Sequence, residues 1–120
     1  MDEQEVVTAY VSAMRRGAEA EDDMMSLFAA DAVYIEPFSG TPRESVGREA
    51  IRSTLRAGWA EPLPDMLLDV HEIEVTDRGA RSRWTCTSPA LPGPAQGEDL
   101  YTIEDGKITR LEVRFLEAGD

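Results

Sequence analysis

Hydrophobic residues recur at two different periods along the chain, and the change of period separates a helical first half from a strand-rich second half. Apolar side chains at helical spacing predict helices over residues 3–16 and 48–59, with a shorter helix over residues 21–29 between them. Beyond Pro64 the period becomes two. This pattern predicts strands over residues 66–76, 80–88, 97–104 and 107–116.

One more strand and two connections complete the predicted elements. Residues 31–36 read as a strand that ends before Pro37, because a residue that precedes proline is pushed into extended geometry. Residues 38–46 read as a loop, and Asp105-Gly106 predicts a tight hairpin turn. We expect one α+β domain over residues 1–120, with a strongly curved, mixed and mostly antiparallel sheet wrapped as a cone around three helices of the N-terminal half.

Composition narrows the possible partners. The 120 residues include 12 Lys and Arg against 24 Asp and Glu, and the resulting net charge of −12 disfavours nucleic acids and anionic membrane surfaces. Cys86 is the only cysteine, so neither an intramolecular disulfide nor a cysteine-based zinc cluster is possible. The acidic N-terminus is unlike a signal peptide, and no apolar run approaches the ~20 residues that span a bilayer. We therefore expect a cytoplasmic protein.

Three polar side chains fall on the apolar faces of their own elements. Tyr10 lies on the apolar stripe of the first helix, Glu36 shares a strand face with Tyr34, and Asp99 shares the more apolar face of its strand with Tyr101. Burying a carboxyl group without a partner costs several kcal/mol. Three such positions in a small domain therefore indicate a pocket in which Glu36 acts as general base while Tyr10 and Asp99 donate hydrogen bonds to a developing enolate oxygen.

Each of these residues also has a structural interpretation. Glu36 can be a solvated acid at the end of a strand, and Tyr10 can be a helix tyrosine whose hydroxyl reaches solvent. Asp99 can be a buried acid that caps a loop or pairs with an arginine such as Arg114. Only the catalytic interpretation requires all three side chains to converge on one cavity.

Other reactive residue types do not form recognisable sites. His71 is the only histidine, which excludes a histidine-rich metal site, and Cys86 reads as a small core residue. Ser39 and Ser45 lie in no Gly-x-Ser-x-Gly setting, and no glycine-rich phosphate loop follows a strand. We therefore expect no metal and no cofactor. Arginines near residues 78–83 read as the solvated or partner-facing side of the sheet.

The order of elements and several segments resemble the NTF2-like superfamily across nearly the whole chain. The segments are Leu27-Phe-Ala-Ala-Asp-Ala-Val33, Glu36-Pro-Phe38, Gly47-Arg-Glu-Ala-Ile51 and Asp105-Gly-Lys-Ile108. Glu36-Pro-Phe38 followed by Gly47-Arg-Glu-Ala-Ile51 resembles the ketosteroid isomerase branch, of which the SnoaL-like polyketide cyclases are near relatives. The resemblance implies the cone-shaped fold, and it makes a homodimer the expected assembly.

The resemblance also implies roles for the three candidates. Glu36 falls where the isomerases have their aspartate base, Tyr10 where they have the oxyanion tyrosine, and Asp99 where they have the protonated oxyanion acid. Two features depart from the pattern. The base is a glutamate, which moves its carboxylate by about one methylene, and Phe28 and Leu55 stand where some isomerases have tyrosines that support the oxyanion tyrosine.

We expect a cofactor-free enzyme that moves a proton within an apolar, steroid-like carbonyl compound through an enolate. Two alternatives remain: a SnoaL-like cyclase in which one inward acid acts alone, and a module that binds an apolar ligand or supports dimerisation through the outer sheet face without turnover. The expected pocket wall consists of Phe38, Met66, Trp84, Tyr101 and Phe115.

Overall fold

A computed structural model describes residues 1–38 and 40–116. The first helix, α1 (Glu3–Arg16), begins with a capping box: the Asp2 side chain accepts a hydrogen bond from the Glu5 amide, and the Glu5 side chain accepts one from the Asp2 amide. It ends at Gly17, whose positive φ of 72° suits a residue without a side chain. Both ends agree with the sequence prediction.

The expected second helix is only partly formed. A 3₁₀ turn (Gly17–Ala20) leads into α2 (Glu21–Ser26), which has six residues and ends three residues before the predicted end. The prediction was wrong there because the following backbone belongs to the sheet: the Leu27 carbonyl accepts a hydrogen bond from the Ile108 amide at 2.8 Å. Only α1 and α3 (Arg48–Ala60) are long helices in the described part of the chain.

In the described part of the chain, six strands form one mixed sheet in the order β2-β1-β6-β5-β4-β3. The β1–β6 pair is parallel and all other pairs are antiparallel, so the α+β class with a mixed, mostly antiparallel sheet is confirmed. The short strand β2 was read from the sequence as loop, which was wrong. The strands are β1 (Phe28–Glu36), β2 (Arg43–Val46), β3 (Leu67–Val75), β4 (Gly79–Thr87), β5 (Ala95–Glu104) and β6 (Lys107–Leu116).

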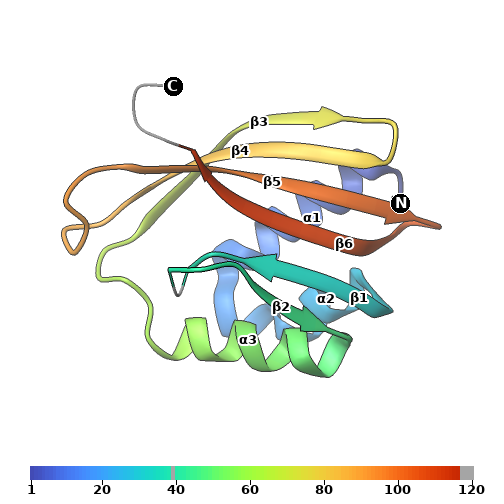
Figure 1. Cartoon of the computed structure of the whole chain (residues 1–120), viewed down its shortest axis with the longest axis horizontal. Coiled ribbons are helices and arrows are strands. Elements are labelled where there is room, and N and C mark those ends of the chain that lie inside the picture. Colours follow the sequence, from blue (N-terminus) through green and yellow to red (C-terminus); the bar gives the residue numbers. More distant parts are fainter. Residues whose placement is uncertain (39, 117–120) are drawn as a thin grey trace.

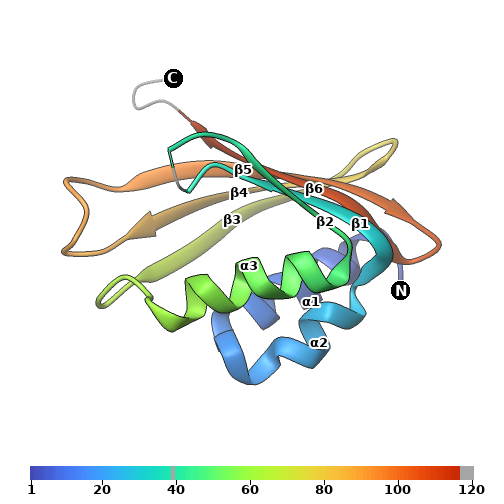
Figure 2. The same ribbon diagram turned by 60° about the horizontal axis from the view of Figure 1, so that its bottom comes forward.

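The helices all lie on one side of the sheet (Figures 1 and 2), where α1 packs against β3 and β4 while α3 packs against β1 and β2. The largest fully buried side chains include Phe28, Met24, Ile51, Ile108 and Leu111, which come from both layers. We call the helix-covered side the inner face. The opposite, outer face has ion pairs, such as Arg81–Glu74 and Arg114–Glu112.

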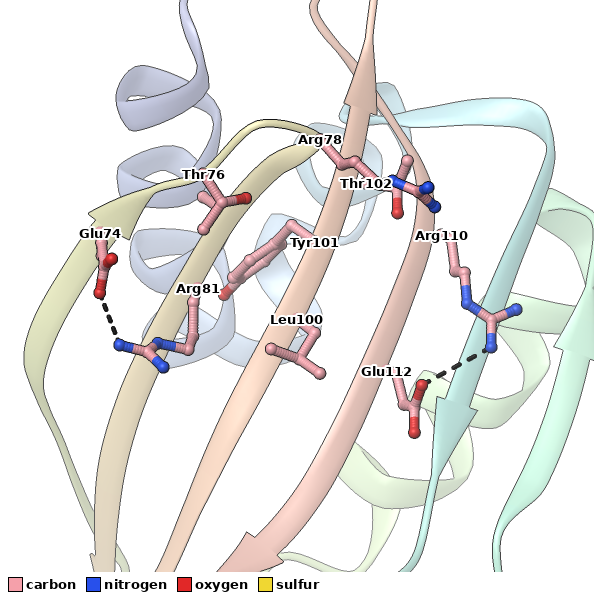
Figure 3. Close-up of a pocket in the computed structure, with 10 residues that line it drawn as sticks. Glu74, Thr76, Arg78, Arg81, Leu100, Tyr101, Thr102, Arg110 and Glu112 are labelled. Carbon is pink, nitrogen blue, oxygen red and sulfur yellow. Dashed lines mark hydrogen bonds and ion pairs between the residues drawn. The ribbon is translucent and has the colours of Figure 1, made fainter.

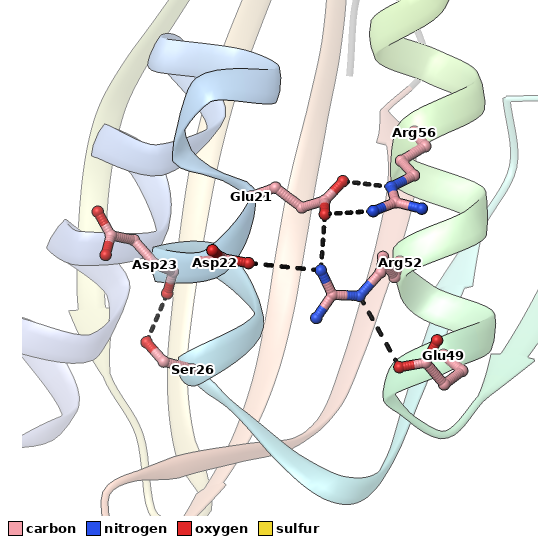
Figure 4. Close-up of polar contacts among 7 residues, drawn as sticks. All are labelled: Glu21, Asp22, Asp23, Ser26, Glu49, Arg52 and Arg56. Carbon is pink, nitrogen blue, oxygen red and sulfur yellow. Dashed lines mark hydrogen bonds and ion pairs between the residues drawn. The ribbon is translucent and has the colours of Figure 1, made fainter.

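An ion-pair cluster joins α2 to α3 beside the core (Figure 4). The Glu21 carboxylate accepts hydrogen bonds from Arg56 and Arg52, and these bonds, that from Arg56 foremost, hold the pKa of Glu21 at about 2. The cluster therefore links α2 to α3 through the side of α2 that does not pack into the core. No helix among residues 1–38 and 40–116 is long and apolar enough to span a membrane.

Candidate active site

Glu36 ends β1 with its side chain on the buried side of the sheet. Alternation along the strand places Tyr34 and Glu36 on the same face, and Glu36 is only 1% exposed, so its interpretation as a solvated acid was wrong. Its register partner in β2 is Arg43, whose Nε donates to Oε1 at 2.8 Å, and the Phe38 amide donates to Oε2 at 2.8 Å. Both carboxylate oxygens are therefore already hydrogen-bonded.

Asp99 lies at the centre of a buried hydrogen-bond network. It is on the inner face of β5, as the sequence predicted, and its Oδ1 accepts a hydrogen bond from Trp84 Nε1 at 3.0 Å. The Tyr101 hydroxyl donates to Oδ2 at 3.3 Å and is itself 3.0 Å from the Ser82 hydroxyl. Burial raises the pKa of Asp99 to about 6, although the bonds from Trp84 and Tyr101 favour the charged form.

The ion pair considered for Asp99 is not formed. Arg114 instead pairs with Glu112, at 2.8 Å between Nε and Oε2, on the outer face of the sheet. No salt bridge in residues 1–38 and 40–116 involves Asp99. The two acids thus differ in their partners: among the described residues, Glu36 has a cationic partner, whereas Asp99 has only neutral hydrogen-bond donors.

Tyr10 reaches the same region from α1. Its ring packs edge-to-face against Phe28 and Tyr101, with centroids 6.4 and 5.6 Å apart, and only 3% of the residue is exposed. Burial raises the pKa of Tyr10 well above its usual value, with smaller contributions from Tyr34, Asp99 and Tyr101. Its hydroxyl makes no hydrogen bond to any residue that the structure describes, so it is available as a donor.

Strand register shows how far apart the two acids lie. Ile35 pairs with Glu112, which brings Glu36 level with Val113, and Val113 pairs with Asp99. The two acids are therefore in one row across the inner face, separated by β6. Two strand spacings correspond to about 10 Å between their backbones. Asp99 is close to Tyr10, whereas Glu36 is at the far end of the row.

Tyr34 is a residue whose part in this region the sequence analysis did not recognise. It is buried next to Glu36, and burial raises its pKa, with the charges of Asp99 and Glu36 adding to the effect. Among the described residues its hydroxyl, like that of Tyr10, has no hydrogen-bond partner. The sequence did offer a signal, because side chains alternate along a strand and Tyr34 therefore lies on the same face as Glu36. Ser82 was also missed, because its contact to Tyr101 depends on strand pairing.

The expected pocket wall divides into a buried and an exposed part. Trp84 and Tyr101 are buried around Asp99, whereas Phe38 and Phe115 are 58% and 50% exposed. Phe115 contacts both Phe38 and Trp84 edge-to-face, at 5.7 and 6.0 Å between ring centroids. An aromatic path thus runs from the surface to Asp99. Met66 is 44% exposed, and no ring or hydrogen-bond contact in the described chain joins it to this path.

Gly97 makes the position of Trp84 possible. It pairs directly with Trp84 across β4 and β5, and a Cβ atom built on it would lie 2.1 Å from the indole ring. The indole therefore lies across the β5 backbone and points Nε1 at Asp99, two residues further along. A glycine inside a strand signals such a close approach, but the sequence analysis began this strand at Gly97, two residues later than the observed Ala95, and so did not use the signal.

Two of the hollows near the surface of the described chain have none of the candidate residues Tyr10, Glu36 and Asp99 in their lining. One is on the outer face of the sheet and the other lies between α1 and β3. On the inner face the space around Asp99 is occupied by aromatic rings, so a ligand pocket there remains a prediction. No group of three potential metal-binding side chains occurs among residues 1–38 and 40–116.

Comparison with known proteins agrees with this architecture. Residues 7–111 match the SnoaL-like domain. The chain belongs to the SnoaL-like domain family. The resemblance found in the sequence segments is thereby confirmed at the level of the family. No curated protein matches the sequence with significance.

Solved structures with the same fold include proteins assigned to both functional branches. A candidate ketosteroid isomerase from Kribbella flavida aligns with 98% of this SnoaL-like chain and 80% of its own, at 18% identity and a TM-score of 0.76. A candidate polyketide cyclase from Sinorhizobium meliloti aligns with 92% and 94%, at 25% identity and a TM-score of 0.73. TerC, crystallised with polyporic acid, aligns with 95% and 91%, at 21% identity and a TM-score of 0.75.

Proposed function

We propose that this protein is an enzyme that moves a proton within an apolar carbonyl compound through an enolate, with Asp99 as the group that accepts and returns the proton. One observation carries the proposal. Asp99 is a buried carboxyl group without a cationic partner among the described residues, its pKa is about 6, and two unpaired phenol hydroxyls lie nearby. A general base works best when its pKa is near the operating pH.

The proposed step uses no further reactant. The Asp99 carboxylate removes a proton from the carbon next to the substrate carbonyl, so that a C–H bond breaks, an O–H bond forms and the electron pair moves to the carbonyl oxygen. The hydroxyls of Tyr10 and Tyr34 donate hydrogen bonds to that oxygen and stabilise its charge. Asp99 then returns the proton to carbon. In a cyclisation the enolate carbon instead attacks a second carbonyl carbon of the same molecule, the π bond of that carbonyl breaks, and Asp99 gives its proton to the resulting alkoxide oxygen.

The isomerase-type arrangement, with Glu36 as base and a protonated Asp99 as donor, is the second candidate. The burial of Glu36 on the same inner face as Asp99 favours it. The ion pair with Arg43 disfavours it, because proton uptake by Glu36 would leave the Arg43 guanidinium without its anionic partner. In our proposal Glu36 instead fixes the connection between β1 and β2.

The ligand we propose is a flat, apolar molecule with a carbonyl or phenol oxygen. The aromatic path formed by Phe38, Phe115 and Trp84 leads such a ring system toward Asp99. TerC, a structural neighbour, was crystallised with polyporic acid, a small organic ligand. Because aromatic side chains fill the space around Asp99, entry requires Phe38 and Phe115 at the surface to move apart.

Turnover of a β,γ-unsaturated ketosteroid, followed by absorbance of the conjugated product, tests the proposal. With Asp99 as the base, Asp99→Asn lowers kcat by about 10²–10⁴-fold, whereas Glu36→Gln retains most of the activity. Loss of activity in Glu36→Gln with retention in Asp99→Asn would establish the isomerase-type arrangement instead. Binding is measured alongside turnover, because a probe that is bound without being converted still reports on the site.

Binding of 2-naphthol separates the enzyme from a passive binding module. An oxyanion site binds the naphtholate form preferentially, so affinity increases with pH and falls in Tyr10→Phe and Tyr34→Phe. If the protein is a module that holds apolar ligands without turnover, wild type and both variants bind 2-naphthol equally well.

We also propose that the chain forms a homodimer in the cytoplasm. Light scattering measures the mass of the assembly.

A further inference from the structure

A hollow of about 390 Å³ lies on the outer face of the sheet, on the side away from the helices (Figure 3). It is bordered by β3 to β6 and by the turn between β3 and β4. Strand pairing explains why the lining of the hollow is polar: Thr102 pairs with Arg110, and Leu100 pairs with both Arg81 and Glu112. Its size is in the range of small-molecule sites.

Gly79 lies between two residues that line the hollow, Arg78 and Ala80, and the sheet has no room for a side chain there. Gly79 pairs with Thr102, and a Cβ atom on Gly79 would lie 2.3 Å from the carbonyl oxygen of Tyr101. Any larger residue would therefore force β4 and β5 apart. The residue before this glycine is Arg78, and its side chain borders the hollow from the turn.

Positive charges outnumber negative charges around the hollow. Three arginines and two glutamates line it, which leaves a net positive charge in a protein of net charge −12. Glu74 is bound by Arg81 at 2.5 Å, whereas Arg110 is 3.6 Å from Glu112. Within the described ranges Arg78 has no ion pair, and Nε of Arg81 is buried without a hydrogen bond. The guanidinium group of Arg78 is therefore available to bind an anion, and the orphaned Nε of Arg81 is a second donor beside the hollow.

We propose that this hollow binds a small organic carboxylate, with the carboxylate held between the guanidinium groups of Arg78 and Arg110 and beside the Thr102 hydroxyl. Figure 3 shows these three side chains on the same side of the hollow. Guanidinium groups match carboxylates geometrically because they donate two parallel hydrogen bonds. Leu100 and the backbone of β5 offer an apolar surface for the rest of the ligand. The site is separate from the proposed active site, which lies across the sheet.

Benzoate and benzamide form a matched pair of probes, because they share a ring and differ in charge. Amide signals of the ¹⁵N-labelled full chain are followed by NMR while either compound is added at constant ionic strength. Benzoate is expected to shift the amides of Thr76, Thr102 and Arg110, and benzamide is not. Arg78→Gln and Arg110→Gln each weaken benzoate binding by about tenfold or more, since a charge-assisted hydrogen bond is lost.

Arg16→Gln is the control, because it removes the same charge from the exposed end of α1, where Arg16 pairs with Asp23. It changes benzoate affinity by less than about twofold, since screening weakens distant charges. Spectra of the free variants report whether each one folds. Equal effects of Arg16→Gln and Arg78→Gln, or equal shifts with benzamide, overturn the proposal. The proposal is also overturned if benzoate shifts only amide signals of the inner face. It is overturned as well if the amide signals of the hollow shift with protein concentration and not with benzoate.

Discussion

Replacing Asp99 by asparagine should stabilise the protein at neutral and higher pH. The pKa of this carboxyl group is about 6 in the folded protein, against an ordinary value of 3.8. A group whose folded pKa is raised stabilises the fold below its unfolded pKa, and that contribution is lost as the pH rises through the folded pKa. The difference of about 2 pH units corresponds to about 3 kcal/mol. Wild type therefore loses this amount between about pH 4 and pH 7.

The asparagine side chain of the variant keeps the main contacts without the charge. Its amide oxygen accepts the hydrogen bond from Trp84 Nε1, and its amino group donates to the Tyr101 hydroxyl, which reverses one bond of the network. The free energy of unfolding of Asp99→Asn, relative to wild type, should therefore increase by about 3 kcal/mol from pH 4 to pH 8. Other carboxyl groups affect both proteins equally and cancel in the difference.

Urea denaturation at intervals of pH, followed by circular dichroism, measures both proteins. Asp69→Asn is the matched control, because Asp69 is an exposed aspartate on the edge strand β3. Its difference from wild type should remain nearly constant with pH. If the curves for Asp99→Asn and wild type are parallel from pH 4 to pH 8, burial does not raise the pKa of Asp99, and the proposed base loses its physical support.

Three further predictions concern the surroundings of Asp99. In a Trp59→Phe background, which leaves Trp84 as the only indole, fluorescence should titrate with a midpoint near pH 6, because Trp84 is hydrogen-bonded to the Asp99 carboxyl group. Tyr101→Phe removes a hydrogen bond that favours the charged form, so carboxyl ¹³C NMR should show an Asp99 pKa above that of wild type. Gly97→Ala should destabilise the protein by about 1–3 kcal/mol in urea denaturation and displace the indole, because its Cβ atom overlaps the ring; unchanged stability would contradict this packing.

Local periodicity was sufficient to find the inward side chains. Period-two alternation along residues 97–104 placed Asp99 and Tyr101 on the buried face, and helical spacing placed Tyr10 on the packed side of α1. These predictions succeeded because burial follows directly from the geometry of a single element. The sequence therefore identified three polar side chains that enter the core, and the burial of Tyr10, Glu36 and Asp99 agrees with that prediction, whereas the buried Ser45 and Ser82 were missed.

Strand pairing and side-chain contacts between different elements could not be predicted in the same way. Gly40 and Pro42 made residues 38–46 look like loop, so β2 was missed, and with it the pairing of Arg43 with Glu36. An antiparallel register that crosses a six-residue connection leaves no periodic signal in the sequence. The hydrogen bonds to Asp99 from Trp84 and Tyr101 depend likewise on how β4 and β5 align. Residue 39, considered as a nucleophile and rejected, lies outside the described residues.

The different partners of the two acids lead to a division of roles. Glu36 lies between a guanidinium group and a backbone amide, and proton uptake by Glu36 would leave Arg43 without its anionic partner. Asp99 has neutral donors and a pKa near 6, so a small change in its surroundings moves it between proton acceptor and proton donor. Substrate binding would exclude water and bring an oxygen to the hydroxyls of Tyr10 and Tyr34, which have no other partner among the described residues. Our proposal therefore assigns proton transfer to Asp99 and the positioning of the β1–β2 connection to Glu36.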